Sequence, residues 1–391
     1  MKLQKYAMFW LLFAAATQLP GRSAAADVVE VIAAPIPPAS TPLPLHVGGR
    51  VSPDPADPAR LWRQWPGSYF ETGFRGRSAF FSVGPGDAIL HILVDGKTVS
   101  TLTRPAPGSY ALKGLDAGRH RLRIEVASES GGGPTAFGGF FAPENSRSRE
   151  PKPRKRQIEF IGDSHTVGYG NTSTTRTCTT DEVWATTDTS QAFAALLGRR
   201  YKADYRIHAI SGRGIVRNYD GGGSAEDTMT AMYPYLLWDR KAVDPQTGWA
   251  PQLIVIALGT NDFSTALHAG EAWPDRDALH AAYEERYVRF VQDLRARNPQ
   301  AHFILWATDA HDGEIAGEVR KVVDRLRALG ETRVTFLPVT GLDFSACHSH
   351  PSLADDKRIA MLLRKAIGKA HGVWRKRDAA FEAIAGRERQ P

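Results

Sequence analysis

Cysteine is scarce in this sequence: its 391 residues include only Cys178 and Cys347. Neither lies near the N-terminus, so there is no cysteine there to carry a lipid anchor. A long apolar run is also missing from that end, because the apolar stretch 7–16 is shorter than the roughly 20 residues a membrane-spanning helix needs. These two absences argue against a protein fixed to a membrane.

The first 26 residues instead have the pattern of an export signal. Lys2 and Lys5 precede the apolar stretch, and small residues follow up to Ala26. This order is typical of a signal peptide that is removed on export, and we place the cut after Ala26. A lone membrane anchor is the alternative. We therefore expect a secreted or periplasmic monomer without membrane contact after cleavage, in a compartment where paired cysteines form disulfides.

The composition is that of a soluble globular protein, with 42% hydrophobic and 23% charged residues and room for two domains. The formal net charge is +7. Part of this excess lies in the signal, in the sequence KPRKR at 152–156 and in the C-terminal tail. We interpret it as solvated surface, and no nucleic-acid partner is expected.

The first half of the chain predicts an all-β domain. Residues 27–45 are rich in proline and read as an extended linker. Residues 46–144 contain short segments of β-branched and aromatic residues between Gly, Pro and Asp turns, which predicts a β-sandwich. Residues 145–157 are polar and basic with two prolines, and we assign them to a second linker.

From residue 158 to about 375 the pattern changes to strands alternating with helices, including one helix near residues 229–238 and a last helix from about Leu353. That alternation predicts an α/β domain in which helices cover both faces of a parallel sheet. Residues 376–391 are a C-terminal tail. No internal repeat is found.

Four motifs follow strands of this α/β domain. They are GDSH at 162–165, SGRG at 211–214, GTND at 259–262 and CHSHPS at 347–352. Ligands of an open parallel sheet bind at the carboxyl ends of its strands. The four motifs are therefore expected to meet at one edge of the sheet.

Their residues suit acyl transfer, which needs a nucleophile, a base and donors for an oxyanion. Ser164 supplies a hydroxyl at a strand-to-loop corner and His350 a base. The N–H groups of Ser164 and Gly212 and the amide of Asn261 supply three donors. No cofactor or metal is required. A zinc site including Cys347, His348 and His350 is the alternative.

These motifs resemble the SGNH, or GDSL, hydrolases. The longer segments GDSHTVGYGN, SGRGIVRNYDGG and HPS, behind a β-sandwich, resemble carbohydrate esterase family 2. The resemblance implies a jelly roll joined to a three-layer α/β/α SGNH domain. It also implies an esterase that removes O-acetyl groups from plant-wall polysaccharides of the acetylxylan or acetylglucomannan type. An SGNH lipase or thioesterase and a non-catalytic carbohydrate-binding protein are the alternatives.

One position departs from the SGNH pattern. Many of these enzymes have an aspartate three residues before the histidine, where this chain has Cys347. The resemblance to family 2 implies a Ser-His dyad in which a backbone carbonyl orients the histidine. Asp343 is the alternative acid.

Three further expectations concern the surroundings of the site. Asp163 braces the corner through hydrogen bonds, and His165 is a bystander. Trp306, at a strand end, is either a platform for a sugar or part of the core. Cys178 and Cys347 lie in loops at the same end of the sheet, so we predict a disulfide between them, with two separate thiols as the alternative.

Overall fold

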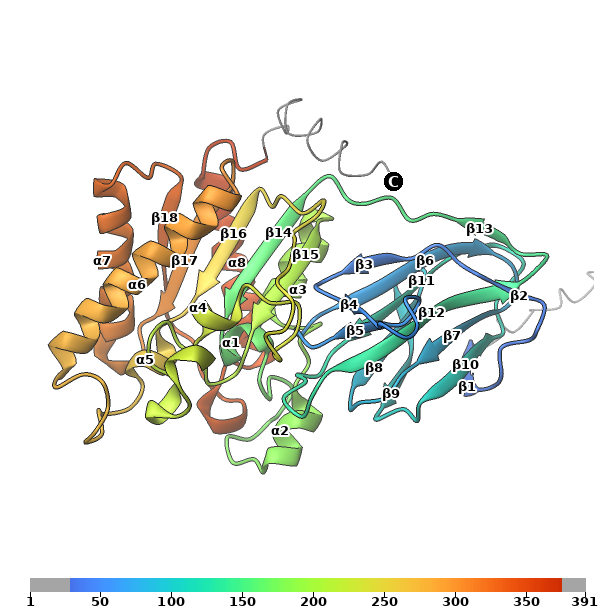
Figure 1. The fold of residues 1–391 in the computed structure, drawn as a ribbon, viewed down its shortest axis with the longest axis horizontal. Helices are drawn as coiled ribbons and strands as arrows, with labels where there is room; N and C mark the ends of the chain where they lie inside the picture. The colour runs from blue at the N-terminus through green and yellow to red at the C-terminus, as the bar shows by residue number, and fades with distance from the viewer. Residues whose placement is uncertain (1–28, 375–391) are drawn as a thin grey trace, which may run out of the picture.

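The computed structural model describes residues 29–374, in which an antiparallel β-sandwich precedes a parallel α/β unit (Figure 1). The predicted signal peptide, its cleavage site and the tail 376–391 lie outside the described residues. Within the described part of the chain, no helix is long and apolar enough to cross a membrane.

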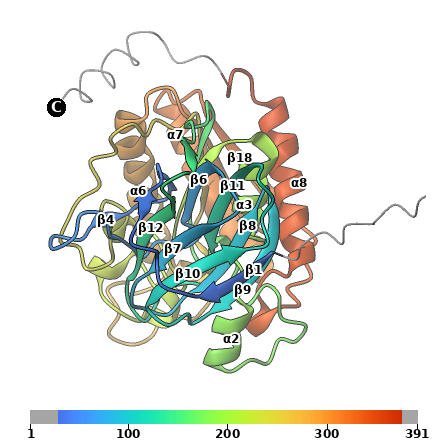
Figure 2. The same ribbon diagram turned by 90° about the vertical axis from the view of Figure 1, so that its right-hand side faces the viewer.

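The β-sandwich consists of two antiparallel sheets that enclose an apolar core (Figure 2). The first sheet has the order β1-β10-β7-β12-β5-β4, with β2 paired to β12. Its strands are β1 (Glu30–Ala33), β2 (Ser40–Pro42), β4 (Ser52–Pro53), β5 (Leu61–Arg63), β7 (Ala79–Val83), β10 (Gly108–Lys113) and β12 (Thr135–Pro143).

The second sheet has the order β13-β6-β11-β8-β9, with β3 paired to β6. Its strands are β3 (His46–Gly48), β6 (Tyr69–Arg75), β8 (Ile89–Val94), β9 (Lys97–Thr103), β11 (Arg119–Val126) and β13 (Arg147–Arg149). Apolar side chains alternate along these strands toward the core, as a half-buried sheet requires.

Both segments predicted as linkers contain strands. β1 and β2 lie in the proline-rich segment 27–45, and β13 lies in the basic segment 145–157. β1 lies at the edge of its sheet, and β2 pairs only with β12. Proline and charge are tolerated on such peripheral strands because one side of the strand need not enter the ladder. The strands were not predicted because the polar or proline-rich composition of these segments is typical of linkers.

The α/β unit has a five-stranded parallel sheet in the order β15-β14-β16-β17-β18. The strands are β14 (Gln157–Gly162), β15 (Asp204–Ala209), β16 (Leu253–Ala257), β17 (His302–Thr308) and β18 (Val334–Val339). The first strand in the chain lies between the second and the third. Its carboxyl end is thus the switch point where doubly wound sheets bind ligands.

Helices cover both faces of this sheet, which confirms the predicted three-layer fold (Figures 1 and 2). One face carries α3 (Phe193–Tyr201) and α8 (Leu353–Lys369), the other α6 (Arg276–Arg297) and α7 (Glu314–Ala328). Short helices lie in the loops: α1 (Ser164–Val167), α2 (Thr180–Thr186), α4 (Met229–Met232), α5 (Thr260–Phe263), and the 3₁₀ turns η1 (Tyr219–Gly221), η2 (Ala225–Asp227), η3 (His311–Gly313) and η4 (Cys347–Ser349).

One predicted helix, near residues 229–238, is reduced to the four residues of α4. Pro234 follows almost at once, and its ring and missing N–H prevent the helix from continuing.

Buried polar contacts fix the sandwich to the α/β unit. Arg154 donates to Glu71 of β6 and to Asp204 of β15, each at 2.7 Å, and the hydroxyl of Tyr69 donates to Asp204 at 2.9 Å. Removing one partner of such a network would leave a buried charge unpaired, which is strongly destabilising. These contacts hold β6 of the sandwich beside β15, the edge strand of the parallel sheet.

Candidate active site

Ser164 is the first residue of α1, directly beyond the end of β14. Asp163 caps this helix, and its carboxylate accepts a hydrogen bond from the N–H of His165 at 3.0 Å. Such a cap satisfies a backbone donor that has no partner inside the helix. It fixes the corner at which the serine hydroxyl is presented.

His350 lies against this serine. Its Nε2 is 2.9 Å from Ser164 Oγ, and its Nδ1 is 3.0 Å from the carbonyl oxygen of Cys347 and 3.2 Å from that of His348. Carbonyl oxygens only accept hydrogen bonds, so the proton of a neutral ring resides on Nδ1. Nε2 is then free to accept the serine proton.

The surroundings of His350 favour its neutral form. Desolvation lowers the pKa of His350 to about 4, although its bonds to the carbonyls of Cys347 and His348 act in the opposite direction. A neutral imidazole at physiological pH is what a general base requires.

Asp343, the alternative acid, is not among the hydrogen-bond partners of His350 in the described part of the chain. Its backbone carbonyl accepts from Arg176 at 2.8 Å, and its N–H donates to Asp355 at 2.9 Å, while the residue itself is exposed. Backbone carbonyls occupy the place that a third side chain would take.

His348 is held away from the serine by its own hydrogen bonds. Its Nε2 lies 2.8 Å from the carbonyl oxygen of Cys178 and its Nδ1 3.0 Å from the hydroxyl of Tyr169. Since the carbonyl can only accept, Nε2 donates and Nδ1 accepts from the tyrosine. The ring of Tyr169 also packs on that of His350, with ring centroids 4.3 Å apart. Sequence reasoning missed Tyr169.

A disulfide joins Cys178 to Cys347, as predicted, with the two Cα atoms 5.5 Å apart. It ties the loop after the nucleophile to the loop that carries His350. Gly170 faces this bridge with φ 58°, and a Cβ there would lie 2.5 Å from the Cβ of Cys347. The oxidised Cys347 has no thiolate to offer, so the alternative zinc site loses a ligand.

The loops predicted to hold an oxyanion flank Ser164. In the sheet register Gly162 pairs with Ala209 on one side and with Ala257 on the other, so the segments leading to Gly212 and Asn261 start beside the serine. Gly212 has φ 80°, a backbone conformation that favours glycine. Asn261 is buried, and its amide donates to the carbonyl of Arg213 at 3.0 Å. An amide group has a second hydrogen, which remains to be donated to a ligand.

Two carboxylates hold the Gly212 loop. Asp262 accepts from the N–H groups of residues 215, 216 and 217, each at 2.9 Å. Glu129 of the sandwich accepts from the N–H and the hydroxyl of Ser211 at 2.8 and 2.7 Å. Glu129 was not predicted, because its role depends on how the two domains pack.

Besides Tyr169, the aromatic residue Tyr219 lies beside the Gly212 loop, whereas Trp306 does not. The N–H of Tyr219 donates to the carbonyl of Gly212 at 2.9 Å, and the residue is 57% exposed. Trp306 is 2% exposed and packs edge-on against Phe193 in the core under α3 and α8. Of the two alternatives for Trp306, the structure therefore supports the core and not the sugar platform, because a buried indole has no free face. β17 is an interior strand covered on both sides, so its side chains face helices.

Comparisons with known proteins agree with this architecture. Residues 47–151 match the family described as carbohydrate esterase 2 N-terminal, and residues 160–365 match the GDSL-like lipase/acylhydrolase family. An acetylxylan esterase / glucomannan deacetylase from Cellvibrio japonicus (strain Ueda107) is 44% identical over 335 residues, which cover 85% of this chain and 93% of that protein. The chain belongs to carbohydrate esterase family 2. It is an esterase, as the resemblance implied.

Two solved structures of carbohydrate esterases have the same fold as this chain. One carbohydrate esterase, whose active site is described as displaying divergent catalytic and non-catalytic binding functions, has a TM-score of 0.81 and 42% identity. It covers 85% of this chain and 100% of its own. A family two esterase from Clostridium thermocellum in complex with cellohexaose has a TM-score of 0.72 and 27% identity, with 84% and 99% covered.

Proposed function

We propose that this esterase is exported and removes O-acetyl groups from plant-wall polysaccharides of the acetylxylan or acetylglucomannan type, with Ser164 and His350 as a catalytic dyad. The observation that carries the proposal is the 2.9 Å hydrogen bond between Ser164 Oγ and His350 Nε2. The ring is oriented by carbonyl oxygens at its other nitrogen.

In the first half-reaction Ser164 Oγ attacks the acetyl carbonyl carbon while its proton moves to His350 Nε2. The C=O π electrons move onto the carbonyl oxygen, which becomes an oxyanion. The imidazolium keeps its Nδ1 hydrogen bonds to the carbonyls of Cys347 and His348. These carbonyls are dipoles rather than full charges, so they stabilise the imidazolium less than a carboxylate would.

The oxyanion is stabilised by the N–H groups of Ser164 and Gly212 and by the second amide hydrogen of Asn261. Donors fixed in place before the reaction stabilise developing charge without the cost of reorganisation. Hydrogen bonds from the Gly212 loop to Glu129 and Asp262 provide that fixation.

The intermediate collapses when the C–O bond to the sugar breaks and His350 Nε2 protonates the departing sugar oxygen. An acetyl ester on Ser164 remains. Water then attacks this ester, gives its proton to Nε2, and the second collapse releases acetic acid and restores the serine hydroxyl.

The surroundings of the dyad favour a sugar ester over a long acyl chain. The segments 171–190 and 218–228 are rich in Thr, Ser, Asp and Gly. Tyr219 presents an exposed ring beside Gly212, suited to the apolar face of a pyranose. The similarity to an acetylxylan esterase / glucomannan deacetylase supports the same substrate class.

Acetate release from acetylated xylan and acetylated glucomannan by the purified protein tests the proposal, beside nitrophenyl esters of short and long acyl chains. We expect release from both polysaccharides and preference for the acetyl ester. Ser164→Ala and His350→Ala are expected to be inactive, since losing one member of such a unit can cost on the order of a millionfold. His348→Ala, the matched histidine control, should stay largely active. Preference for long acyl chains, or loss of activity in His348→Ala alone, would contradict the proposal.

A further inference from the structure

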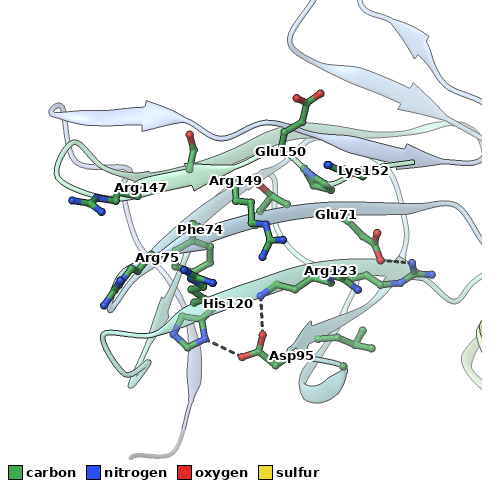
Figure 3. A pocket seen from close by; sticks show the side chains of 18 of the residues that line it. Glu71, Phe74, Arg75, Asp95, His120, Arg123, Arg147, Arg149, Glu150 and Lys152 are labelled. Atoms are coloured by element: carbon green, nitrogen blue, oxygen red, sulfur yellow. Dashed lines mark hydrogen bonds and ion pairs between the residues drawn. The ribbon is translucent and has the colours of Figure 1, made fainter. Parts of the chain in front are cut away.

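The outer face of the second sandwich sheet contains a groove of about 910 Å³. It is formed by β13, β6 and β11 and the segment that follows β13 (Figure 3). Nine Lys or Arg residues and four Asp or Glu residues line it, a formal net charge of +5. Residues 1–26 carry +3 and residues 375–391 carry +2 of the chain's +7, so the rest of the chain carries only +2 and the groove is a local concentration of positive charge.

The strand register arranges these charges in rows. Arg147, Arg75 and Arg119 lie directly opposite one another across β13, β6 and β11. In the next row on the same face, Arg149 and Arg121 lie on either side of Gly73. Gly73 has no side chain between them, and a Cβ there would lie 3.4 Å from the Cβ of Arg149, so Arg149 packs close over this position.

Like charges directly opposite in a sheet destabilise it. A row of three arginines followed by a pair therefore has no advantage for folding. An anionic ligand that neutralises the rows would remove the repulsion, so the arrangement indicates binding.

The carboxylates on the floor of the groove already have hydrogen-bond or ion-pair partners. Glu71 accepts from Arg123 and from Arg154, each at 2.7 Å, and Glu125 accepts from Arg123 at 2.6 Å. Asp95 contacts His120 at 2.9 Å and accepts from the N–H of Arg121 at 2.8 Å (Figure 3). The floor therefore has little negative charge left for the side chains above it.

Of the exposed basic side chains that line the groove, Arg199 lies 4.0 Å from Glu125, and the other six have no carboxylate partner among residues 29–374. Arg75 donates only to the carbonyl of Ala117, at 3.4 Å. We call these residues the cationic trench: Arg75, Arg119, Arg121, Arg147, Arg149 and Lys152.

We propose that the cationic trench binds a carboxylate-bearing segment of a polysaccharide, that is, a chain containing uronic acids. The planar guanidinium group matches a carboxylate with two parallel hydrogen bonds. Neighbouring strands are about 5 Å apart and alternate residues about 7 Å apart along a strand, so the rows form an array wider than one small ion. A polymer with repeated carboxylates fits such an array.

Single-stranded nucleic acid fits the trench less well. Proteins that bind single strands stack bases on exposed aromatic rings. Among the groove-lining residues the only Phe, Tyr or Trp is Phe74, and it is buried in the sandwich core. The exposed carboxylate of Glu150 also lines the groove and can accept hydrogen bonds from sugar hydroxyls. The choice of a sugar polyanion rests on the proposed function, whereas the charge of the trench does not.

The trench is separate from the catalytic dyad. Arg119 and Arg121 lie near the start of β11, whereas Glu129, which contacts the Gly212 loop, follows its end. Eight residues of extended chain correspond to roughly 25 Å. Binding in the trench can therefore be measured without catalysis.

The test uses the full-length Ser164→Ala protein and isothermal titration calorimetry. The probes are polygalacturonate and the same polymer with its carboxyl groups reduced to alcohols. We expect binding of the first, weakened by salt, and no binding of the second. Arg121→Ser/Arg149→Ser should lower the affinity by at least about tenfold, as the loss of two charge-assisted contacts implies. Arg77→Ser/Lys113→Ser is the matched control, because it removes the same charge from exposed sandwich positions outside the trench.

Equal binding of the reduced polymer, or equal losses in the two double variants, would overturn the proposal. A DNA duplex that binds as tightly as polygalacturonate and is released by the same trench substitutions would overturn it in favour of nucleic acid.

The melting temperature of the trench variant should stay unchanged or rise, because repulsion is removed, and a fall would indicate a structural role. With Ser164 intact, hydrolysis of nitrophenyl acetate should be unaffected by the trench substitutions. Failure of the proposed deacetylation would leave the binding result standing, so the two failures are distinguishable.

Discussion

The carboxylate of Glu129 accepts two hydrogen bonds from Ser211, one from its N–H at 2.8 Å and one from its hydroxyl at 2.7 Å. Glu129 belongs to the sandwich, and Ser211 directly precedes Gly212, whose N–H we assign to the oxyanion hole. The sandwich therefore helps to position a loop of the catalytic domain.

We expect Glu129→Ala to lower kcat on nitrophenyl acetate by about tenfold with little change in KM, because the donor it positions acts on charge that develops in the transition state. Ser211→Ala, which removes only the hydroxyl bond, should have a smaller effect. Glu144→Ala, at an exposed sandwich position, serves as the control. A raised KM with unchanged kcat would instead make Glu129 a substrate contact.

The parts of the site that the sequence predicted share one property. Ser164, Gly212, Asn261 and His350 each follow a strand of the parallel sheet, and the carboxyl ends of parallel strands meet at one edge. The position of each motif directly after a strand is therefore enough to predict that these four residues lie close together. The helix from Leu353 was also predicted, and a capping box at Ser352 marks its start.

The parts that were missed depend on packing between distant segments. Glu129 and Ser211 are 82 residues apart, and no local pattern indicates that they touch. The trench depends on the register of β13 against β6, in a segment whose charge suggested a linker. Trp306 was left open between platform and core because a strand end does not reveal whether a helix covers it.

Tyr219 provides a test of substrate recognition. Tyr219→Ala should raise KM for acetylated polysaccharide by roughly three- to tenfold, as the loss of one aromatic contact of about 0.5–1.5 kcal/mol implies. Hydrolysis of nitrophenyl acetate should change little, since that ester has no sugar to stack. Tyr219→Phe keeps the ring and should behave as wild type on both substrates. Equal losses on the two substrates would assign the ring a structural role.

Asn261→Ala should lower kcat by roughly a hundred- to a thousandfold with a smaller change in KM, because its amide acts mainly on the oxyanion. The same amide donates to the carbonyl of Arg213, so stability should fall by about 1 kcal/mol as well. Thermal unfolding separates the two effects. An unchanged kcat in the folded variant would remove Asn261 from the oxyanion hole.

The dyad predicts an unusual pH dependence. Because desolvation lowers the pKa of His350 to about 4, the base stays neutral down to that pH, and kcat/KM should be flat from neutral pH to about 5. Below pH 4 it should fall about tenfold per pH unit, as expected for one protonation. A carboxylate at Nδ1 would raise this pKa, so a midpoint at roughly 6.5 or above would contradict the dyad.

Acid unfolding has to be separated from protonation of the base. Desolvation lowers the pKa of His165 to about 3 and that of His208 to about 4, below the ordinary value of 6.5. The unfolded chain takes up these protons first, so stability is lost as the pH falls from about 6.5 toward 4. We therefore expect the melting temperature to decrease across that range, and circular dichroism at each pH of the rate profile shows where the fold is lost. Loss of signal before the loss of activity would mean that the profile reports unfolding.

The disulfide between Cys178 and Cys347 should support both stability and catalysis. It closes a separation of 169 residues, for which the chain-entropy account gives about 4–5 kcal/mol before any strain is subtracted. It also holds the carbonyls of Cys178 and Cys347, which bond His348 and His350, in one unit. We expect Cys178→Ser/Cys347→Ser to melt at a lower temperature and to lose kcat even where it is fully folded, because the base is then less well oriented.

Reduction of the wild type should reproduce both losses, whereas the double variant should not respond to reductant. Two alkylatable thiols in unreduced protein exported to an oxidising compartment, or full kcat in the folded double variant, would contradict this role.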